Sequence, residues 1–123
     1  MLFNKIGIRF IDIDYAVQFF ITILGFRQHS LLLTQNKKRI ICIEKNNIVL
    51  ELFETTEPFE KRGFLKLLSF EVDDIKKTIN ELRKKDVKIV EDITKSSDKN
   101  ANKFLFAYFE GPESIKLGLF QKL

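Results

Sequence analysis

The side chains that could carry covalent or metal chemistry are few in this chain. It has one cysteine, Cys42, and one histidine, His29. Cys42 lies in the apolar stretch RIICIE, which favours a small buried side chain over a reactive thiol. His29 lies on a weakly patterned strand, which favours an ordinary surface or edge position. The sequence has no Cys–His or Ser–His pair for nucleophilic catalysis and no glycine loop for phosphate.

A pair of carboxylates is the other chemistry to consider. Glu51 lies in the strand-like segment IVLELFE and Glu71 in LSFEV. General acid–base catalysis needs a carboxyl group whose pKa is shifted, or a metal beside it, and the sequence gives neither signal. Glu51 is therefore only a weak catalytic candidate. A partner cation is expected close to it if it is buried, because an unpaired buried carboxylate is costly.

Composition sets the class of protein that must position these residues. The chain has 123 residues, of which 45% are hydrophobic and 31% are charged, as in a globular protein. The net charge is +4, but the lysines are spread along the chain and no basic–aromatic RNA motif or zinc-finger spacing occurs. No nucleic-acid partner is therefore expected. The apolar runs are too short to span a bilayer, and no signal peptide is evident, so no membrane partner is expected. The single cysteine fits a reducing cytoplasm.

Two stretches of the sequence have the same layout. KIGIRFIDIDYAVQFFITILGF predicts a strand, a helix capped by Asp12 and a stop at Gly25. LLSFEVDDIKKTINELRKKDVKI predicts a strand, a helix capped by Asp73 or Asp74, and a further strand. Three strands follow the first helix, at 26–33, 39–44 and 48–54, and the turn KNN joins the last two. After the second helix we expect strands at 87–93, 103–109 and 114–120, with TKSSDKNAN (94–102) as a mobile loop.

The chain is therefore predicted to be two β-α-β-β-β modules of the α+β class. A shift of 62 positions places Asp12 on Asp74, and a shift of 67 places LELFE on LGLFQ. We expect one domain over 1–123, with module one at 1–57, a linker at 55–64 marked by Pro58 and Gly63, and module two at 65–123. One sheet face in each module carries no helix, so pairing around a shared concavity is expected.

This organisation resembles the vicinal oxygen chelate superfamily, which includes glyoxalase I, extradiol dioxygenases and bleomycin-resistance proteins. The resemblance rests on IGIRFIDIDYAVQFFITILGF, on LSFEVDDIKKTINELRKKDVKIVED and on YFEGPESIKLGLFQ, in that order along the chain. It implies a cupped mixed sheet. Enzymes of the superfamily hold a divalent metal on ligands from the first and last strand of each module. Those positions correspond here to Lys5, Glu51, Leu67 and Gly118.

Only Glu51 among these four positions is a usual metal ligand. Lys5 carries a cation, and Leu67 and Gly118 offer no side-chain donor. We therefore expect no metal and no cofactor, with Lys5 standing beside Glu51 in place of the metal. Phe53, Phe120 and Leu67 would form an apolar floor, and Lys5, Arg9 and Lys116 would orient an anionic or carbonyl-bearing ligand. The predicted ligand-binding residues are Lys5, Arg9, Glu51, Phe53, Leu67, Ser69, Lys116 and Phe120.

Three functions fit this picture. The favoured hypothesis is a metal-free, bleomycin-resistance-like protein that binds a small molecule, although the basic chain departs from the acidic cup of that branch. The alternative is a lyase- or isomerase-type enzyme with Glu51 as its base or sole retained metal ligand. The third is a protein-interaction module whose cup is closed by ion pairs. The resemblance and the apolar first helix also predict a homodimer, in which the modules pair within one chain or swap between two.

Overall fold

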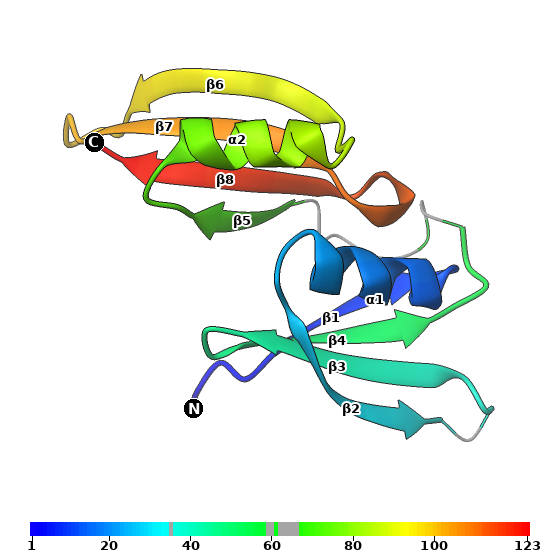
Figure 1. Ribbon diagram of the computed structural model, residues 1–123. Coiled ribbons are helices and arrows are strands. Elements are labelled where there is room, and N and C mark those ends of the chain that lie inside the picture. Colours follow the sequence, from blue (N-terminus) through cyan, green and yellow to red (C-terminus); the bar gives the residue numbers. More distant parts are fainter. Residues whose placement is uncertain (35, 59–60, 62–66) are drawn as a thin grey trace. The chain divides into compact units, whose positions relative to one another are not determined.

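The computed structural model describes residues 1–34, 36–58, 61 and 67–123. The chain forms two compact units, Met1–Phe64 and Leu65–Leu123, which we call the first and second unit. Each contains one α-helix and one four-stranded mixed sheet in the order β-α-β-β-β (Figure 1). The predicted fold class is therefore confirmed. No helix in the described part of the chain is long and apolar enough to cross a membrane.

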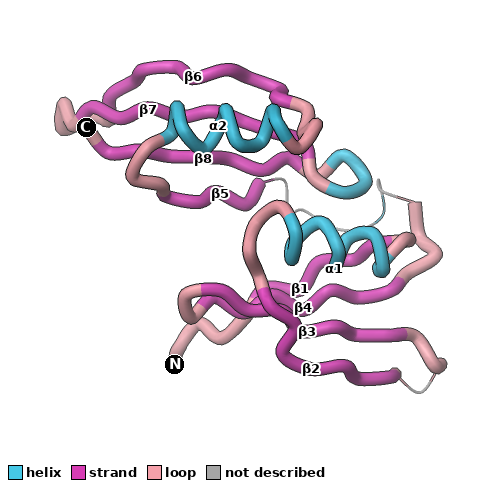
Figure 2. Tube along the Cα trace, viewed as in Figure 1, coloured by secondary structure: helices cyan, strands magenta, loops and turns pink. Residues whose placement is uncertain are grey.

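The first unit contains a sheet with strand order β1-β4-β3-β2. Strands β1 and β4 are parallel, and the other neighbouring strands are antiparallel. Figure 2 shows the helix α1 as the one helical segment between β1 and β2. The elements are β1 (Ile6–Phe10), α1 (Ile13–Thr22), β2 (Arg27–Leu33), β3 (Arg39–Lys45) and β4 (Ile48–Glu54).

Both ends of α1 follow the prediction. The backbone N–H of Tyr15 donates a 3.0 Å hydrogen bond to the Asp12 side chain, which caps the N-terminus. At the other end, Gly25 has a positive φ of 77°, and the N–H of Phe26 donates to the carbonyl of Phe20 at 3.0 Å. This is a glycine-terminated helix end. It turns the chain so that the ring of Phe26 packs against that of Phe20, with 5.5 Å between the ring centroids.

The core of the first unit lies between α1 and one face of the sheet. Alternate residues of β1, β3 and β4 point towards the helix and are buried, as period-two alternation predicts. The helix contributes its own apolar stripe to the same core. The buried strand residues are Ile8, Phe10, Ile41, Ile43, Leu50 and Leu52, and the buried helix residues include Ile13, Ala16, Val17 and Phe20.

The predicted hairpin between β3 and β4 is also present. Its two-residue turn consists of Asn46 and Asn47, with φ values of 49° and 67°. Two consecutive positive φ angles are typical of the tight turn that suits the twist of an antiparallel pair, and asparagine accepts them more easily than most residues. The turn fixes the register of β3 against β4, and with it the face on which Glu51 lies.

The second unit repeats the arrangement, with strand order β5-β8-β7-β6 and β5 parallel to β8. Asp74, and not Asp73, caps the helix through a 3.1 Å hydrogen bond from the N–H of Lys77. Ile75, Ile79 and Leu82 are buried against the sheet. The elements are β5 (Leu67–Glu71), α2 (Ile75–Lys84), β6 (Ile89–Ser97), β7 (Lys103–Glu110), a 3₁₀ turn at Pro112–Ser114, and β8 (Lys116–Lys122).

One element was predicted wrongly. The segment 94–102 was expected to be a mobile loop, but its first four residues continue β6 and pair with the start of β7. Backbone hydrogen bonds to β7 hold these residues in the sheet. Their polar side chains are compatible with this position, because β6 is an edge strand whose side chains need not be buried. The turn itself is held by Asp98, which accepts from the N–H groups of Asn100 and Asn102 at 2.8 and 3.0 Å. These bonds, led by that from Asn102, keep the pKa of the Asp98 carboxyl below its ordinary value.

The segment between the units is only partly described. The N–H of Thr55 donates to the carbonyl of Phe10 at 3.0 Å, so the chain stays attached to β1 just after β4 ends. The rest of the predicted linker, 55–64, includes residues 59, 60 and 62–64, which lie outside the described residues, as do Leu65 and Lys66 at the start of the predicted strand 65–72.

Candidate functional site

Each sheet has one face that packs against its helix and one face that does not, which we call the helix-free face. The strand registers determine which residues lie on it. In the first sheet, Gly7 pairs with Glu51, Glu51 with Cys42, and Cys42 with Ser30, so these four residues form a row across the strands. The neighbouring row on the same face contains Arg9, Phe53, Ile40 and Leu32.

The centre of this first face is an ion pair. Lys5 Nζ lies 3.2 Å from Glu51 Oε1, and the Glu51 side chain is only 15% exposed. The other oxygen, Oε2, accepts a 3.7 Å contact from the Sγ of the buried Cys42. The cation expected beside Glu51 is therefore present, and both carboxylate oxygens have partners within the first unit.

The other predicted residues of this face also have protein partners. Arg9 Nη1 donates to Glu57 Oε2 at 3.2 Å, and Nη2 donates to the carbonyl of Lys61 at 3.4 Å. The Phe53 ring covers Gly7 so closely that a Cβ on Gly7 would lie 2.8 Å from Phe53 Cε2. Two ion pairs and the Phe53 ring thus engage the predicted residues of this face.

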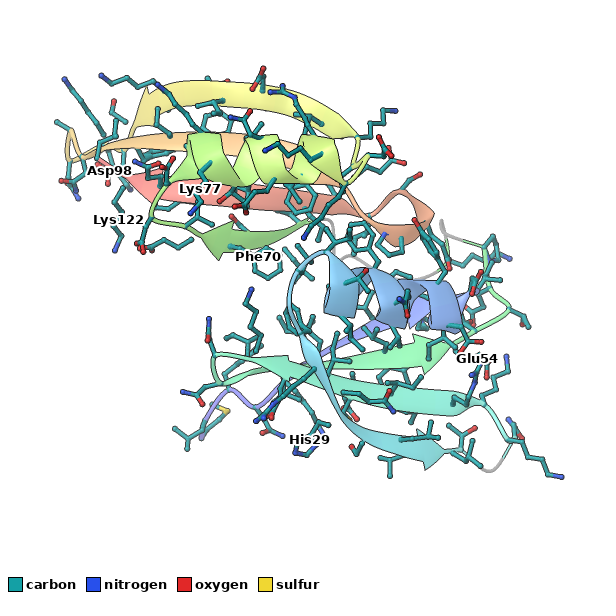
Figure 3. The ribbon with its side chains drawn as sticks, in the orientation of Figure 1. His29, Glu54, Phe70, Lys77, Asp98 and Lys122 are labelled. Atoms are coloured by element: carbon teal, nitrogen blue, oxygen red, sulfur yellow. The ribbon has the colours of Figure 1, made fainter. Side chains whose placement is uncertain are left out.

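His29 lies away from this row. It is exposed and belongs to β2, the edge strand, where the register shifts between Gln28 and Ser30 (Figure 3). Its Nδ1 lies 3.4 Å from Ser30 Oγ. This agrees with the surface or edge position that was predicted for it.

A network of ion pairs lies on the helix side of the first sheet. Arg39 donates to both oxygens of Asp14 at 2.7 and 3.1 Å and to Glu54 at 3.1 Å. These hydrogen bonds lower the pKa of the Asp14 and Glu54 carboxyls and raise the pKa of Arg39. The network ties the first turn of α1 to the end of β4, so we assign it a structural role.

The helix-free face of the second sheet has a different composition. Its central register pair is Ser69 with Gly118. A Cβ on Gly118 would lie 3.1 Å from Ser69 Oγ and 3.3 Å from both Leu67 Cδ1 and Tyr108 Cε1. Gly118 is buried under these three neighbours, and its missing side chain allows the Tyr108 ring to approach β8 closely.

An aromatic patch, made of Phe104, Phe106, Tyr108 and Phe120, lies on the same face. Its ring centroids are separated by 6.1 Å (Phe104–Phe106), 5.0 Å (Phe104–Phe120) and 5.5 Å (Phe106–Tyr108). All four side chains are half-buried, so part of each ring remains accessible. Lys116 Nζ lies 3.9 Å from the centre of the Tyr108 ring, within the range of a cation–π contact.

Two acidic residues that border the patch, Glu71 and Glu110, have partners of their own. Glu71 Oε1 lies 3.7 Å from Lys122 Nζ, near the C-terminal end of β8 (Figure 3). Glu110 Oε2 lies 3.5 Å from Lys88 Nζ, and its Oε1 accepts from Ser114 Oγ at 3.4 Å. The carboxylates beside the patch therefore do not neutralise Lys116.

The eight predicted ligand-binding residues divide equally between the two sheets. Lys5, Arg9, Glu51 and Phe53 lie on the helix-free face of the first. Leu67, Ser69, Lys116 and Phe120 lie on that of the second. Within each sheet they are neighbours, and their role in binding stays a prediction.

Three residues of the aromatic patch were missed in the sequence. Phe104, Phe106 and Tyr108 belong to β7, whereas site residues were sought only on the first and last strand of each module. The signal was available in KFLFAYF, where these three aromatics alternate with Leu105, Ala107 and Phe109. Period-two alternation places them on the face of Phe120.

The residues at the implied metal positions do not fit a divalent metal. Lys5 supplies only donors and is paired with Glu51, while Leu67 and Gly118 supply no ligand atom. Across residues 1–34, 36–58, 61 and 67–123, no group of three or more His, Cys, Asp or Glu side chains is arranged to hold a metal.

The sequence matches the family model for the Glyoxalase/Bleomycin resistance protein/Dioxygenase superfamily over residues 2–117. This match spans nearly the whole chain, including both repeats. The chain belongs to this superfamily. A search of curated protein sequences gave no match.

Solved structures share the fold at low sequence identity. A glyoxalase family protein from Enterococcus faecalis has a TM-score of 0.75 and 18% identity, covering 97% of this chain and 96% of that one. TnmS3, an antibiotic binding protein from Streptomyces sp. CB03234, has a TM-score of 0.73 and 17% identity, covering 100% and 98%. Lactoylglutathione lyase from Agrobacterium tumefaciens has 0.66 and 13%, covering 98% and 92%. These likenesses concern the fold alone, which an antibiotic binding protein and a lyase both have.

Proposed function

We propose that this superfamily member is a metal-free protein that binds a small organic molecule on the helix-free face of the second sheet. The observation that carries the proposal is the aromatic patch of Phe104, Phe106, Tyr108 and Phe120, with all four rings half-buried. Aromatic side chains that stay partly accessible on a sheet face offer a flat apolar surface on which a planar group can stack.

Two further observations support binding without metal catalysis. The Glu51 carboxylate has Lys5 on one oxygen and Cys42 on the other, as expected of a structural ion pair. These contacts within the chain favour a structural role over that of a general base, which must reach the proton of a bound substrate. Leu67 and Gly118 supply no metal donor at the positions where the family resemblance implies ligands. The antibiotic binding of TnmS3 is a precedent in this fold for binding, and it does not name the ligand here.

A neutral fluorescent probe tests the binding surface. The chain contains no tryptophan, so the fluorescence of N-phenyl-1-naphthylamine can be followed with little protein background. We expect the probe to bind, and Phe106→Ala to weaken binding about tenfold, since stacking on one aromatic ring contributes about 1–1.5 kcal/mol. Phe3→Ala is the matched control, because Phe3 is exposed and lies outside the patch. Equal loss in both variants, or no binding by the native protein, would contradict the proposal.

Metal analysis tests the second half of the proposal. Protein purified without chelator is expected to carry no stoichiometric divalent metal, and added Zn²⁺ or Ni²⁺ is expected not to change probe binding. Stoichiometric metal that is lost in Glu51→Ala would instead support the lyase or isomerase alternative, with Glu51 as a ligand.

A further inference from the structure

We infer that the ligand is an aromatic anion, whose acidic group is held by Lys116 while its ring stacks on the aromatic patch. This inference rests on the proposed function. It adds the charge of the ligand and names Lys116 as the residue that recognises this charge. Three observations carry it: the direction of the Lys116 side chain, the pairing of the surrounding charges, and the place of Lys116 at the border of the patch.

The first observation is where the Lys116 ammonium group lies. In the sheet register Lys116 pairs with Leu67 and Glu110, whereas Tyr108 pairs with Gly118, two residues further along β8. Rows of one face are separated by about 6.5–7 Å along a strand. Because Nζ is only 3.9 Å from the Tyr108 ring centre, the side chain leans one row towards the patch.

The next row contains Phe106 and Phe120, which are register partners. A ring stacked there would have Lys116 Nζ at the Tyr108 end of the same surface. A sulfonate, carboxylate or phosphate on that ring would then meet an exposed ammonium group that makes no ion pair with the described part of the chain. The cation–π contact with Tyr108 restricts the ammonium position before a ligand arrives, which lowers the entropy cost of forming the new contact.

The second observation is that the neighbouring carboxylates are engaged elsewhere. Glu71 is paired with Lys122 and Glu110 with Lys88. In the described part of the chain, Lys116 has no carboxylate within ion-pair distance. An anionic ligand would therefore supply the counter-charge that the protein does not.

A third acid on this face, Glu91, would favour a cationic ligand instead. It pairs with Tyr108 in the register, but it is exposed and lies on β6, the edge strand. The third observation is the place of Lys116 at the border of the patch: it is on β8, between β5 and β7, directly beside the Tyr108 ring. A cationic ligand stacked on the patch would lie close to Lys116 and would be repelled by it, so the position of Lys116 favours an anion.

Two probes with one aromatic skeleton test the inference. 8-Anilinonaphthalene-1-sulfonate differs from N-phenyl-1-naphthylamine by its sulfonate group, so comparing them isolates the charge. We expect the native protein to bind the sulfonate more tightly, by about fivefold, with the advantage falling as salt is added. In Lys116→Gln the sulfonate should lose about fivefold in affinity, while the neutral probe should change by less than twofold.

Lys122→Gln is the matched control, because it removes a cation from the same strand and the same face but one that Glu71 already neutralises. It should leave the neutral probe unchanged and weaken sulfonate binding less than Lys116→Gln does, because the Glu71 carboxylate that it releases is 59% exposed and screened by solvent. Circular dichroism and thermal unfolding of both variants establish that they are folded.

The outcomes separate the two proposals. Binding of the neutral probe with no loss of sulfonate binding in Lys116→Gln would overturn the aromatic-anion inference and leave the proposed function standing. An equal loss in Lys122→Gln would also overturn it, because the attraction would then come from net charge. Failure of the native protein to bind either probe would overturn both proposals.

Discussion

Lys5 Nζ lies 3.2 Å from Glu51 Oε1, at the position where the family resemblance implies two metal ligands facing one another. The ammonium group balances a carboxylate that is only 15% exposed. The counter-charge of Glu51 is thus supplied by the chain itself.

Breaking the pair from the lysine side should destabilise the first unit. Lys5→Met leaves the Glu51 carboxylate half-buried without its cation, so we expect the free energy of unfolding to fall by about 1 kcal/mol. In a Glu51→Gln background the same change should cost much less. Urea denaturation of the two single variants and the double variant measures this coupling. Additive effects would show that the pair contributes nothing.

The contact between Phe53 and Gly7 predicts a cost for a single methyl group. A Cβ on Gly7 would lie 2.8 Å from Phe53 Cε2, so Gly7→Ala must displace the ring, and we expect a loss of about 1–2 kcal/mol in the free energy of unfolding. In a Phe53→Ala background the ring is gone, and Gly7→Ala should be neutral or stabilising, because alanine restricts the unfolded chain. Chemical denaturation of the four proteins is the measurement. A loss that persists without Phe53 would mean that another contact, and not the ring, opposes the methyl group.

The C-terminal ends of α1 and α2 differ in the residue that takes the left-handed conformation, and a mutation can make them alike. Gly25 ends α1 with φ at 77°, whereas the corresponding turn after α2 has Asp86 at φ 59°. A left-handed conformation costs about 1 kcal/mol for a residue with a Cβ, and a carboxylate is also unfavourable at a helix C-terminus.

We therefore expect Asp86→Gly to raise the free energy of unfolding by about 0.5–1 kcal/mol, and Gly25→Ala to lower it by about 1 kcal/mol. Thermal unfolding followed by circular dichroism measures both. Asp86→Ala is the control, since it removes the charge but keeps the strained backbone. A stabilisation by Ala equal to that by Gly would assign the whole effect to charge.

The network of Arg39 with Asp14 and Glu54 predicts how stability responds to acid. Hydrogen bonds from Arg39 lower the pKa of both carboxyls in the folded protein, from ordinary values of 3.8 and 4.5. The two carboxylates therefore make their full contribution to the free energy of unfolding at pH values above their unfolded pKa values of 4.5 and 3.8. This contribution is lost as the pH falls below these values towards the lower pKa values of the folded protein.

Removing the arginine should flatten this dependence. In Arg39→Met the two carboxyls lose the partner that lowers their pKa, so the difference in stability between native and variant protein should shrink between pH 6 and pH 3. Urea denaturation at a series of pH values checks this. A difference that stays constant with pH would mean that Arg39 stabilises the unit through packing and not through these carboxylates.

The expected homodimer stays a prediction, and sedimentation offers a direct measurement of it. A single species of 14.5 kDa at all concentrations would rule it out.

Much of the fold was readable because the deciding signals are local. Asp12 caps the first helix, Gly25 ends it, and Asn46–Asn47 forms the hairpin, each through contacts within a few residues. Thr94–Ser97 was assigned to a loop because its side chains are polar. Its strand conformation depends on the distant backbone of β7, which no local pattern reports.

The sequence by itself determined the β-α-β-β-β repeat and the absence of donor atoms at Leu67 and Gly118, because these follow from residue type and spacing. Only the tertiary structure decided the state of the candidate site. It brought Lys5 to Glu51, placed the Phe53 ring over Gly7, and gathered the rings of β7 and β8 with Lys116 over Tyr108. Such contacts join residues far apart in the chain, and their geometry depends on strand register and close packing, which residue spacing alone does not specify.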